Sequence, residues 1–221
     1  MEENEVELGL REQILYYRRR APEYDETSVA PDGADAERFG PWLERLEVGG
    51  DVLEIACGTG LWTQHLIRSA ASLTALDSSP EMVELARRRA PGSEARFVVA
   101  DFFRWRPERR YGCVFFGFWL SHVPPERFAA FWRLLEACFE PGGRALFVDE
   151  GAERAPRRAH PGAAFIERRL RNGSTFRIVK VFHEPDALAR ALAKLGWAAR
   201  IEPLEEGFLA GVARPAGGGA W

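Results

Sequence analysis

Glycine residues follow the first apolar run of the chain in a pattern that suits ligand binding. Residues 52–55 form a short apolar run, Gly58 and Gly60 come next, and an amphipathic segment continues to about residue 69. Glycine has no Cβ, so a ligand can approach the backbone closely, and the first N–H groups of a helix are free to bind it. A strand, a glycine turn and a helix in this order predict a nucleotide or nucleoside site in an open α/β sheet.

Two aspartates end the next two apolar runs. Asp77 follows residues 73–76 and comes about 20 positions after Gly58, the spacing at which an acid binds ribose hydroxyls. Asp101 and Phe102 follow residues 95–100 and would supply the acceptor and the apolar wall that an adenine pocket needs. The alternative for both aspartates is a plain strand-end turn.

Aromatic residues and a histidine follow the fourth apolar run, residues 113–117. Phe118 and Trp119 could wall a cation, because ring faces attract positive charge, or they could be core residues at a strand end. His122 could take a proton from a substrate hydroxyl or amine. It could equally cap the following helix or bind a backbone carbonyl, so both interpretations stay open.

Apolar periodicity predicts alternating strands and helices along the rest of the chain. We expect strands at 52–56, 73–76, 95–100, 113–117, 144–148, 199–204 and 207–213. We expect helices at 10–20, 36–46, 81–89, 125–139 and 184–195, and a short helix between the glycine turn and residue 69. Asn172-Gly173 predicts a hairpin with strands at about 167–171 and 174–182. This insertion follows the fifth strand, so it is expected to help form the substrate pocket.

Composition limits the function further. The chain has 221 residues, a formal net charge of -3 and a pI of about 5.9, which argues against a large nucleic-acid footprint. Cys57, Cys113 and Cys138 show no metal-ligand spacing, so we expect no metal. We also expect no membrane partner and a cytoplasmic location, because we find neither a signal peptide nor a spanning apolar stretch. The oligomeric state is left open.

The glycine turn resembles the E-x-G-x-G-x-G turn of class I S-adenosylmethionine-dependent methyltransferases. Glu54, Gly58 and Gly60 match this pattern, and Ala56 replaces its first glycine. That replacement matters only if the backbone there needs a positive φ. A dinucleotide-dependent oxidoreductase would need glycine at Thr63, so this alternative is disfavoured. A cofactor-binding protein without turnover is a third alternative.

The segment 16–25 resembles the tyrosine-rich leader that lies across the active site of many small-molecule methyltransferases. The match is carried by six residues, Tyr17, Ala21, Pro22, Glu23, Tyr24 and Asp25. The alternative is a surface helix that packs its tyrosines on the core. No Asp/Asn-Pro-Pro-Tyr/Phe sequence follows the fourth strand, which disfavours methylation of nucleic-acid bases.

The resemblance covers about residues 14–213 and implies a Rossmann-like, doubly wound α/β fold. Its seven-stranded sheet would be mostly parallel, with an antiparallel C-terminal strand and a helical N-terminal lid. We divide the chain into a lid (1–35), a methyltransferase domain (36–214) with a cap insertion at about 151–183, and a flexible tail (215–221). The resemblance also implies S-adenosylmethionine as cofactor and methyl transfer to a small molecule, with oxygen preferred over nitrogen or carbon as the accepting atom.

The same resemblance and the strand-end positions give a set of expected site residues. The expected cofactor-binding residues are Tyr17, Tyr24, Glu54, Ala56, Gly58, Gly60, Trp62, Asp77, Ser78, Met82, Asp101, Phe102, Phe118 and Trp119. The expected substrate-binding residues are Tyr16, Arg20 and Ser121, and the expected catalytic residue is His122. For an acidic acceptor no base would be needed, and His122 would only orient it.

Overall fold

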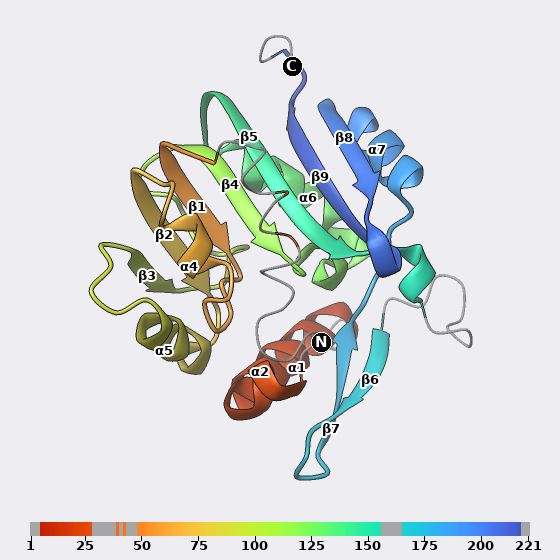
Figure 1. Cartoon of the computed structure of the whole chain (residues 1–221). Coiled ribbons are helices and arrows are strands. Elements are labelled where there is room, and N and C mark those ends of the chain that lie inside the picture. The colour runs from red at the N-terminus through yellow and green to blue at the C-terminus, as the bar shows by residue number, and fades with distance from the viewer. Residues whose placement is uncertain (1–4, 28–38, 40–41, 43–47, 156–164, 218–221) are drawn as a thin grey trace.

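A seven-stranded sheet with the order β3-β2-β1-β4-β5-β9-β8 forms the centre of the protein (Figure 1). The computed structural model describes residues 5–27, 39, 42, 48–155 and 165–217. The strands are β1 (Asp51–Ile55), β2 (Ser72–Asp77), β3 (Arg96–Val99), β4 (Tyr111–Gly117), β5 (Phe139–Glu150), β8 (Trp197–Pro203) and β9 (Phe208–Pro215). The first five pair in parallel, and β9 runs antiparallel between β5 and β8. The predicted fold class is therefore confirmed.

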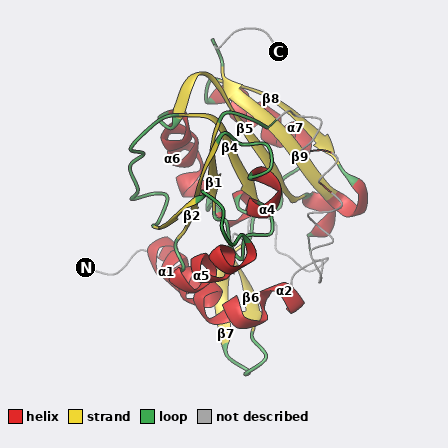
Figure 2. Cartoon of the chain, turned by 60° about the vertical axis from the view of Figure 1, so that its left-hand side comes forward, coloured by secondary structure: helices red, strands yellow, loops and turns green. Residues whose placement is uncertain are grey.

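Alternate residues of the central strands pack on opposite faces of this sheet, as the two-residue period of a strand requires. In β4, Val114 and Phe116 face the larger core cluster, while Cys113 and Phe115 face the other. Helices α6 (Pro125–Glu136) and α7 (Pro185–Lys194) cover the first face, and the short helix α4 (Thr63–Leu66) covers the second. Figure 2 shows α6 and α4 on opposite sides of the sheet.

Helix α5 (Pro80–Arg89) packs on β2 and β3 beside the glycine turn. The Ser79 hydroxyl accepts a hydrogen bond from the Met82 N–H at 3.2 Å, and Pro80 occupies the first turn. Serine at the N-cap and proline at the first helical position stabilise a helix start, as the sequence predicts. The start of α5 is thereby fixed at the carboxyl end of β2.

The N-terminal helix is longer than predicted. Helix α1 (Glu5–Arg20) begins five residues before the predicted start at residue 10, and it continues through a 3₁₀ turn, η1 (Ala21–Glu23), into α2 (Tyr24–Thr27). Pro22 does not end the helical path, because proline is tolerated in the first turn of a helix, where its missing N–H has no partner to lose. The expected helix at 36–46 lies, apart from residues 39 and 42, outside the described residues, as does the tail beyond residue 217.

The predicted hairpin is confirmed as β6 (Phe165–Arg169) and β7 (Thr175–Val179). It packs along α1, so that both lie together beyond the carboxyl ends of the parallel strands (Figure 1). Gly9 makes this packing possible, because a Cβ there would lie 2.2 Å from the ring of Phe165. The Gln13 side chain also accepts a hydrogen bond from the Val179 N–H at 3.0 Å.

Two boundaries in the predicted sequence of elements were wrong. The helix after the glycine turn ends at Leu66, and α6 ends at Glu136 rather than at residue 139. Strand β5 begins at Phe139, five residues before the predicted start at residue 144. Tyr111 pairs with Phe139 while Cys113 pairs with Arg144, so the extra residues of β5 form an irregularity in the pairing. Gly142 permits it with a φ of +81°.

Within the described ranges, no helix combines the length and the apolar character that crossing a membrane requires.

Two glycines of β4 differ in the space around them, and this difference gives a stability prediction. A Cβ at Gly117 would lie 2.4 Å from Trp62 Nε1, whereas the nearest atom to a Cβ at Gly112 is 3.7 Å away. The Trp62 ring cannot move freely, because it packs against aromatic neighbours including Phe115 and Phe118. We predict that Gly117→Ala lowers the free energy of unfolding by about 1–3 kcal/mol.

The matched control is Gly112→Ala in the same strand, which should change the free energy of unfolding by less than about 0.5 kcal/mol. Chemical denaturation of the two variants measures both values. Equal losses in the two variants would mean that crowding against Trp62 is not the cause.

Candidate active site

The turn after β1 holds its backbone in the left-handed region at three positions. Ala56, Gly58 and Gly60 have φ values of +55°, +55° and +84°. A Cβ at Gly60 would lie 2.9 Å from the Cα of Ala86 in α5, so this position needs glycine for space as well as for conformation. A Cβ at Gly58 would meet nothing within 4 Å, which leaves the space above this residue open to a ligand. Alanine at position 56 has a cost of about 1–2 kcal/mol, because its Cβ disfavours the left-handed conformation.

Asp77 joins this turn to the start of α5. Its Oδ2 accepts a hydrogen bond from the Gly58 N–H at 3.0 Å, and its Oδ1 accepts one from the Ser79 N–H at 2.8 Å. Burial raises the pKa of Asp77 to about 6, although these N–H groups and that of Ser78 act to lower it. Each carboxylate oxygen retains acceptor capacity, so the residue can bind hydroxyl groups as well.

Glu54 lies beneath the turn and is almost fully buried. Its Oε2 accepts a hydrogen bond from the Thr63 hydroxyl at 2.6 Å, and burial raises its pKa to about 8. Thr63 occupies the position where a dinucleotide fold has its third glycine, and here its hydroxyl holds the carboxyl group of Glu54. Glu54 thus supports the turn from below and does not line a cavity.

A first cavity of about 300 Å³ lies over the turn, between α1 and the carboxyl ends of the strands. Predicted cofactor residues contribute much of its lining, namely Tyr17, Tyr24, Ala56, Gly58, Asp77, Ser78, Met82, Asp101, Phe102, Phe118 and Trp119. Asp101 accepts a hydrogen bond from the Phe103 N–H at 3.0 Å, which fixes its carboxylate beside the ring of Phe102. The cavity therefore combines two carboxylates with an apolar wall.

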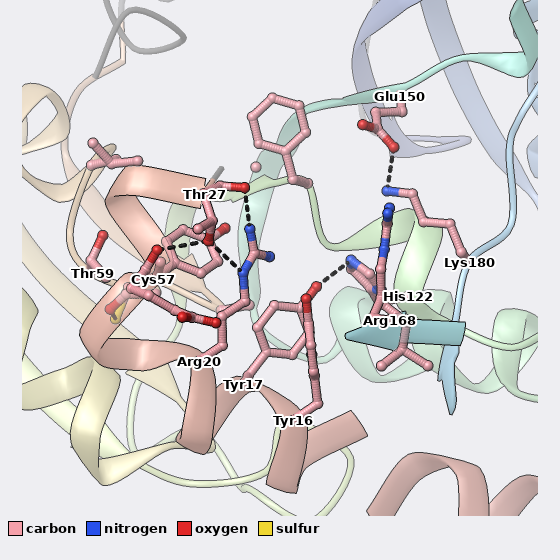
Figure 3. Close-up of a pocket in the computed structure, with 18 of the residues that line it drawn as sticks. Tyr16, Tyr17, Arg20, Thr27, Cys57, Thr59, His122, Glu150, Arg168 and Lys180 are labelled. Atoms are coloured by element: carbon pink, nitrogen blue, oxygen red, sulfur yellow. Dashed lines mark hydrogen bonds and ion pairs between the residues drawn. The ribbon is translucent and has the colours of Figure 1, made fainter. Parts of the chain in front are cut away.

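A second cavity of about 310 Å³ is rich in positive charge. Its cationic residues are Arg20, Arg168, Arg169, Arg171 and Lys180, and its acidic residues are Glu23 and Glu150. Figure 3 shows His122, Arg168 and Lys180 on one side and Arg20 with Thr27 on the other, with the tyrosines of α1 between them. Most of the cations come from the β6–β7 hairpin and the residue that follows it.

The two cavities meet at one place. Seven residues line both of them: Tyr17, Tyr24, Ala56, Gly58, Gly117, Phe118 and His122. Phe118 has a φ of +56°, which is unusual for a bulky residue, and its N–H is held by the Val148 carbonyl at 2.7 Å. A group bound in the first cavity can therefore reach a molecule in the second at this junction.

His122 is held at the junction by hydrogen bonds on both ring nitrogens. Nδ1 lies 2.7 Å from the Val179 carbonyl oxygen, and Nε2 lies 2.8 Å from the Tyr17 hydroxyl. Burial and the nearby charge of Lys180 lower the pKa of His122 well below its usual value, so the ring is neutral at physiological pH. A general base at this position would first have to exchange its hydrogen bond with Tyr17, and that role stays a prediction.

Lys180 forms a buried ion pair at the far wall of the second cavity. Its Nζ lies 2.6 Å from Glu150 Oε2 and donates to the Ser121 hydroxyl at 3.0 Å. Burial acts to raise the pKa of Glu150, but the charge and hydrogen bond of Lys180 outweigh it and lower that pKa. Ser121 was expected to contact the substrate, but the structure places it behind Lys180, where it lines neither cavity.

Other expected residues also lie away from their predicted places. Trp62 lines the second cavity and not the first, because its ring packs over Gly117. Glu54 and Gly60 shape the turn without lining either cavity. Tyr16 and Arg20 line the second cavity, and their role toward a substrate stays a prediction.

Sequence reasoning found Arg20 but missed the other four cations of the second cavity. Arg168, Arg169 and Arg171 flank the Asn-Gly turn, so a predicted hairpin with several arginines at the substrate face was the available signal. Lys180 gave a weaker signal, as one of only two lysines in the chain. Among the described residues, no cluster of three or more His, Cys, Asp or Glu side chains could hold a metal ion.

Comparison with known proteins identifies the family. A family model described as a methyltransferase domain matches residues 52–143. Two solved structures, titled "DhpI-SAH complex structure" and "DhpI-SAM-HEP complex", are 39% and 40% identical to this chain, with TM-scores of 0.84 and 0.83. They cover 95% and 94% of this chain, and each is itself covered to 98%. The chain belongs to the class I S-adenosylmethionine-dependent methyltransferases.

Curated relatives of this methyltransferase match over shorter stretches. A ubiquinone biosynthesis O-methyltransferase of Xanthomonas euvesicatoria pv. vesicatoria is 32% identical over 161 residues, which are 69% of this chain and 64% of the relative. A trans-aconitate 2-methyltransferase of Enterobacter sp. (strain 638) is 34% identical over 96 residues, which are 40% of this chain and 37% of the relative. The chain thus spans less than two thirds of the length of these curated relatives.

The first cavity fits S-adenosylmethionine, the cofactor of this methyltransferase family. The open space above Gly58 leaves room for the cofactor against the backbone. The carboxylate of Asp77 suits the ribose hydroxyls, and Asp101 with Phe102 suits the adenine ring. These individual assignments follow the sequence-based expectation and stay predictions.

The raised pKa of Asp77 predicts a pH dependence of cofactor binding. The ionised carboxylate accepts hydrogen bonds from a diol better than the protonated form does, so bound cofactor favours ionisation. Affinity for S-adenosylmethionine should therefore be constant above about pH 7 and fall as the pH drops through about 6, by up to about tenfold per pH unit. Glu54 has a pKa of about 8 and is already protonated in this range, so it does not contribute to the change.

Calorimetry between pH 5 and 8 measures this dependence, with Asp77→Asn as the control. The variant should bind more weakly at pH 7, by roughly tenfold or more, because a charge-assisted bond is lost. Its affinity should also be flat with pH. A wild-type slope that persists in Asp77→Asn would remove Asp77 from the ribose site.

Proposed function

We propose that this methyltransferase transfers a methyl group to an oxygen of a small oxyacid anion, such as a carboxylate. The observation that carries the proposal is the basic second cavity, which meets the cofactor cavity at Tyr17 and His122. A cavity of about 310 Å³ suits a small molecule rather than a polymer. Transfer to nitrogen or carbon is the alternative within the same enzyme class.

Not all of the positive charge in the second cavity is neutralised by the protein. Lys180 is paired with Glu150, and Arg171 is paired with Glu26 at 2.5 Å. In contrast, Arg168 and Arg169 pair with β7 through the strand backbone, but neither guanidinium group forms an ion pair or a hydrogen bond with any other residue that the structure describes. The two residues are neighbours in β6, so their side chains point to opposite faces of the hairpin, and the Arg169 guanidinium group lies near Gly173. The guanidinium group of Arg168 is therefore available to an anion, and its planar donors match the geometry of an oxyacid. The same charge would disfavour a cationic amine as acceptor.

An ionised oxyacid also suits the state of His122. Its oxygen carries the nucleophilic lone pair without losing a proton, so the reaction does not require a general base. Both ring nitrogens of His122 are engaged in hydrogen bonds, and the ring is held neutral. The names of relatives support the same acceptor class, since trans-aconitate is a carboxylate and another relative is an O-methyltransferase.

The residues of this chain would mainly position the acceptor. When bound, S-adenosylmethionine supplies an electrophilic methyl group: the bond from the acceptor oxygen to the methyl carbon forms as the carbon–sulfur bond breaks, and its electron pair stays on sulfur. Arg168 would orient the anion, and the tyrosines of α1 would exclude water from the junction. Positioning of this kind lowers the entropic part of the barrier.

A panel of acceptors tests the proposal. The enzyme is incubated with S-adenosylmethionine and with small carboxylates, phosphonates, phenols and amines, and products are identified by mass spectrometry. We expect methyl esters of oxyacids: a methyl ester of a carboxylate is recognised by its hydrolysis in mild base, and a methyl ester of a phosphonate by its mass and fragmentation. Turnover confined to amines, or to carbon acceptors, would contradict the proposal.

Arg168 gives a second prediction for the accepted oxyacid. Arg168→Gln removes a charge-assisted hydrogen bond to the anion, which should raise the acceptor KM by roughly 10- to 100-fold. The dissociation constant of S-adenosylmethionine should change less than about twofold, because Arg168 lines only the second cavity. Lys180 is a poorer target, because its removal would leave Glu150 buried without a partner.

The matched control is Arg190→Gln, which removes the same charge from an exposed position of α7. Its acceptor KM should stay within about twofold of wild type, since exposed charges far from a site are screened by salt. Equal increases of KM in both variants would show that net charge, and not contact with Arg168, sets acceptor binding.

A further inference from the structure

The hydrogen bonds of His122 determine where the proton of the Tyr17 hydroxyl points. The carbonyl oxygen of Val179 can only accept, so the Nδ1 atom 2.7 Å away from it must carry a hydrogen. In a neutral ring Nε2 is then bare and can only accept. The Tyr17 hydroxyl, 2.8 Å from Nε2, must therefore donate its single proton to His122.

This arrangement is fixed by contacts between α1 and β7. The side chain of Gln13 accepts a hydrogen bond from the Val179 N–H at 3.0 Å, and its amide lies 3.4 Å from the carbonyl oxygen of His122. Both Gln13 and His122 are buried, and the His122 and Tyr17 rings meet edge to face with centroids 5.4 Å apart. The imidazole therefore has little freedom to turn, and neither does the phenol that donates to it.

The direction of this proton matters because Tyr17 lies at the junction of the two cavities. Because the Tyr17 hydroxyl donates its proton to His122, only its oxygen lone pairs can face that junction. The group that suits an oxyanion is elsewhere, on Arg168. An oxygen lone pair at the junction attracts positive charge, so it suits a cationic group with polarised C–H bonds.

We propose that His122 is a positioning residue that turns the Tyr17 oxygen toward the methyl–sulfonium group of S-adenosylmethionine, so that the site prefers this cation over the demethylated product. The inference rests on the proposed function, because it explains what His122 does when the acceptor needs no base. C–H···O contacts are individually weak, and here the positive charge of the sulfonium adds to the attraction. S-adenosylhomocysteine lacks both the methyl group and the charge, so it gains nothing from the same oxygen.

The experiment is a ratio of two affinities measured on the same protein. Calorimetry at pH 7.5 gives the dissociation constants of S-adenosylmethionine and S-adenosylhomocysteine for wild type and Tyr17→Phe. We expect the variant to bind S-adenosylmethionine about two- to fivefold more weakly and S-adenosylhomocysteine unchanged. Both ligands use the same ribose and adenine contacts, so the ratio cancels the contribution of Asp77.

Two substitutions at His122 separate positioning from packing. His122→Gln places a side-chain oxygen near the position of Nε2, where it can still accept from Tyr17, and should keep the wild-type ratio. His122→Asn places its amide near Nδ1, keeps the bond to Val179 and leaves Tyr17 without an acceptor. His122→Asn should therefore lose the preference for S-adenosylmethionine to the same extent as Tyr17→Phe. Thermal unfolding of both His122 variants checks that they fold.

Tyr16→Phe is the matched control, because it removes a hydroxyl from the neighbouring tyrosine, which lines only the second cavity. Its affinity ratio should equal that of wild type. Equal weakening of both ligands in Tyr17→Phe, or the same ratio in His122→Gln and His122→Asn, would overturn the proposal. The test uses no acceptor, so it can fail or succeed independently of whether an oxyacid is methylated.

Discussion

The left-handed backbone at the carboxyl ends of β1 and β4 is the constraint on which the rest of the site depends. Ala56 and Phe118 adopt it without being glycine, which costs free energy at both positions. The neighbouring backbone offsets this cost with short hydrogen bonds, from Cys57 N to Leu76 O at 3.0 Å and from Phe118 N to Val148 O at 2.7 Å. Because these bonds belong to the buried sheet, the core keeps both turns open toward the two cavities.

The N-terminal segment, residues 5–27, is attached to the sheet domain in a different way. Paired charges contribute much of its attachment, including Arg18 with Glu81, Asp25 with Arg89 and Glu7 with Arg127. Such partly exposed pairs contribute up to about 1 kcal/mol each, far less than burial of the aromatic core beneath the sheet. The segment also has buried contacts, through Gln13 and Tyr16, and it forms one wall of the cofactor cavity.

The sequence predicts the sheet well, because its strands are short apolar runs that end at turn residues. The register of β5 was not predictable, since the irregular pairing opposite Tyr111 depends on two strands together. The glycine turn and Asp77 could be found because their spacing along the chain is fixed by one strand–helix–strand unit. Tyr17 and His122 are 105 positions apart, and their hydrogen bond depends on α1 lying across the sheet edge. No local sequence pattern predicts that contact, so the donor and acceptor roles of the two ring nitrogens of His122 could be assigned only from the structure.

The distribution of charge explains how an acidic protein can hold a basic cavity. The buried pair of Lys180 and Glu150 is neutral as a unit, and its desolvation makes it a weak source of stability. Arg168, on the β6–β7 hairpin that stands apart from the main sheet, has no carboxylate at ion-pair distance among the described residues and contributes uncompensated charge at the cavity. The first cavity is built on the turns of the sheet, whereas the second cavity takes most of its cations from a two-stranded insertion. We therefore expect substitutions in the hairpin to alter the second cavity without disturbing the turns that line the first.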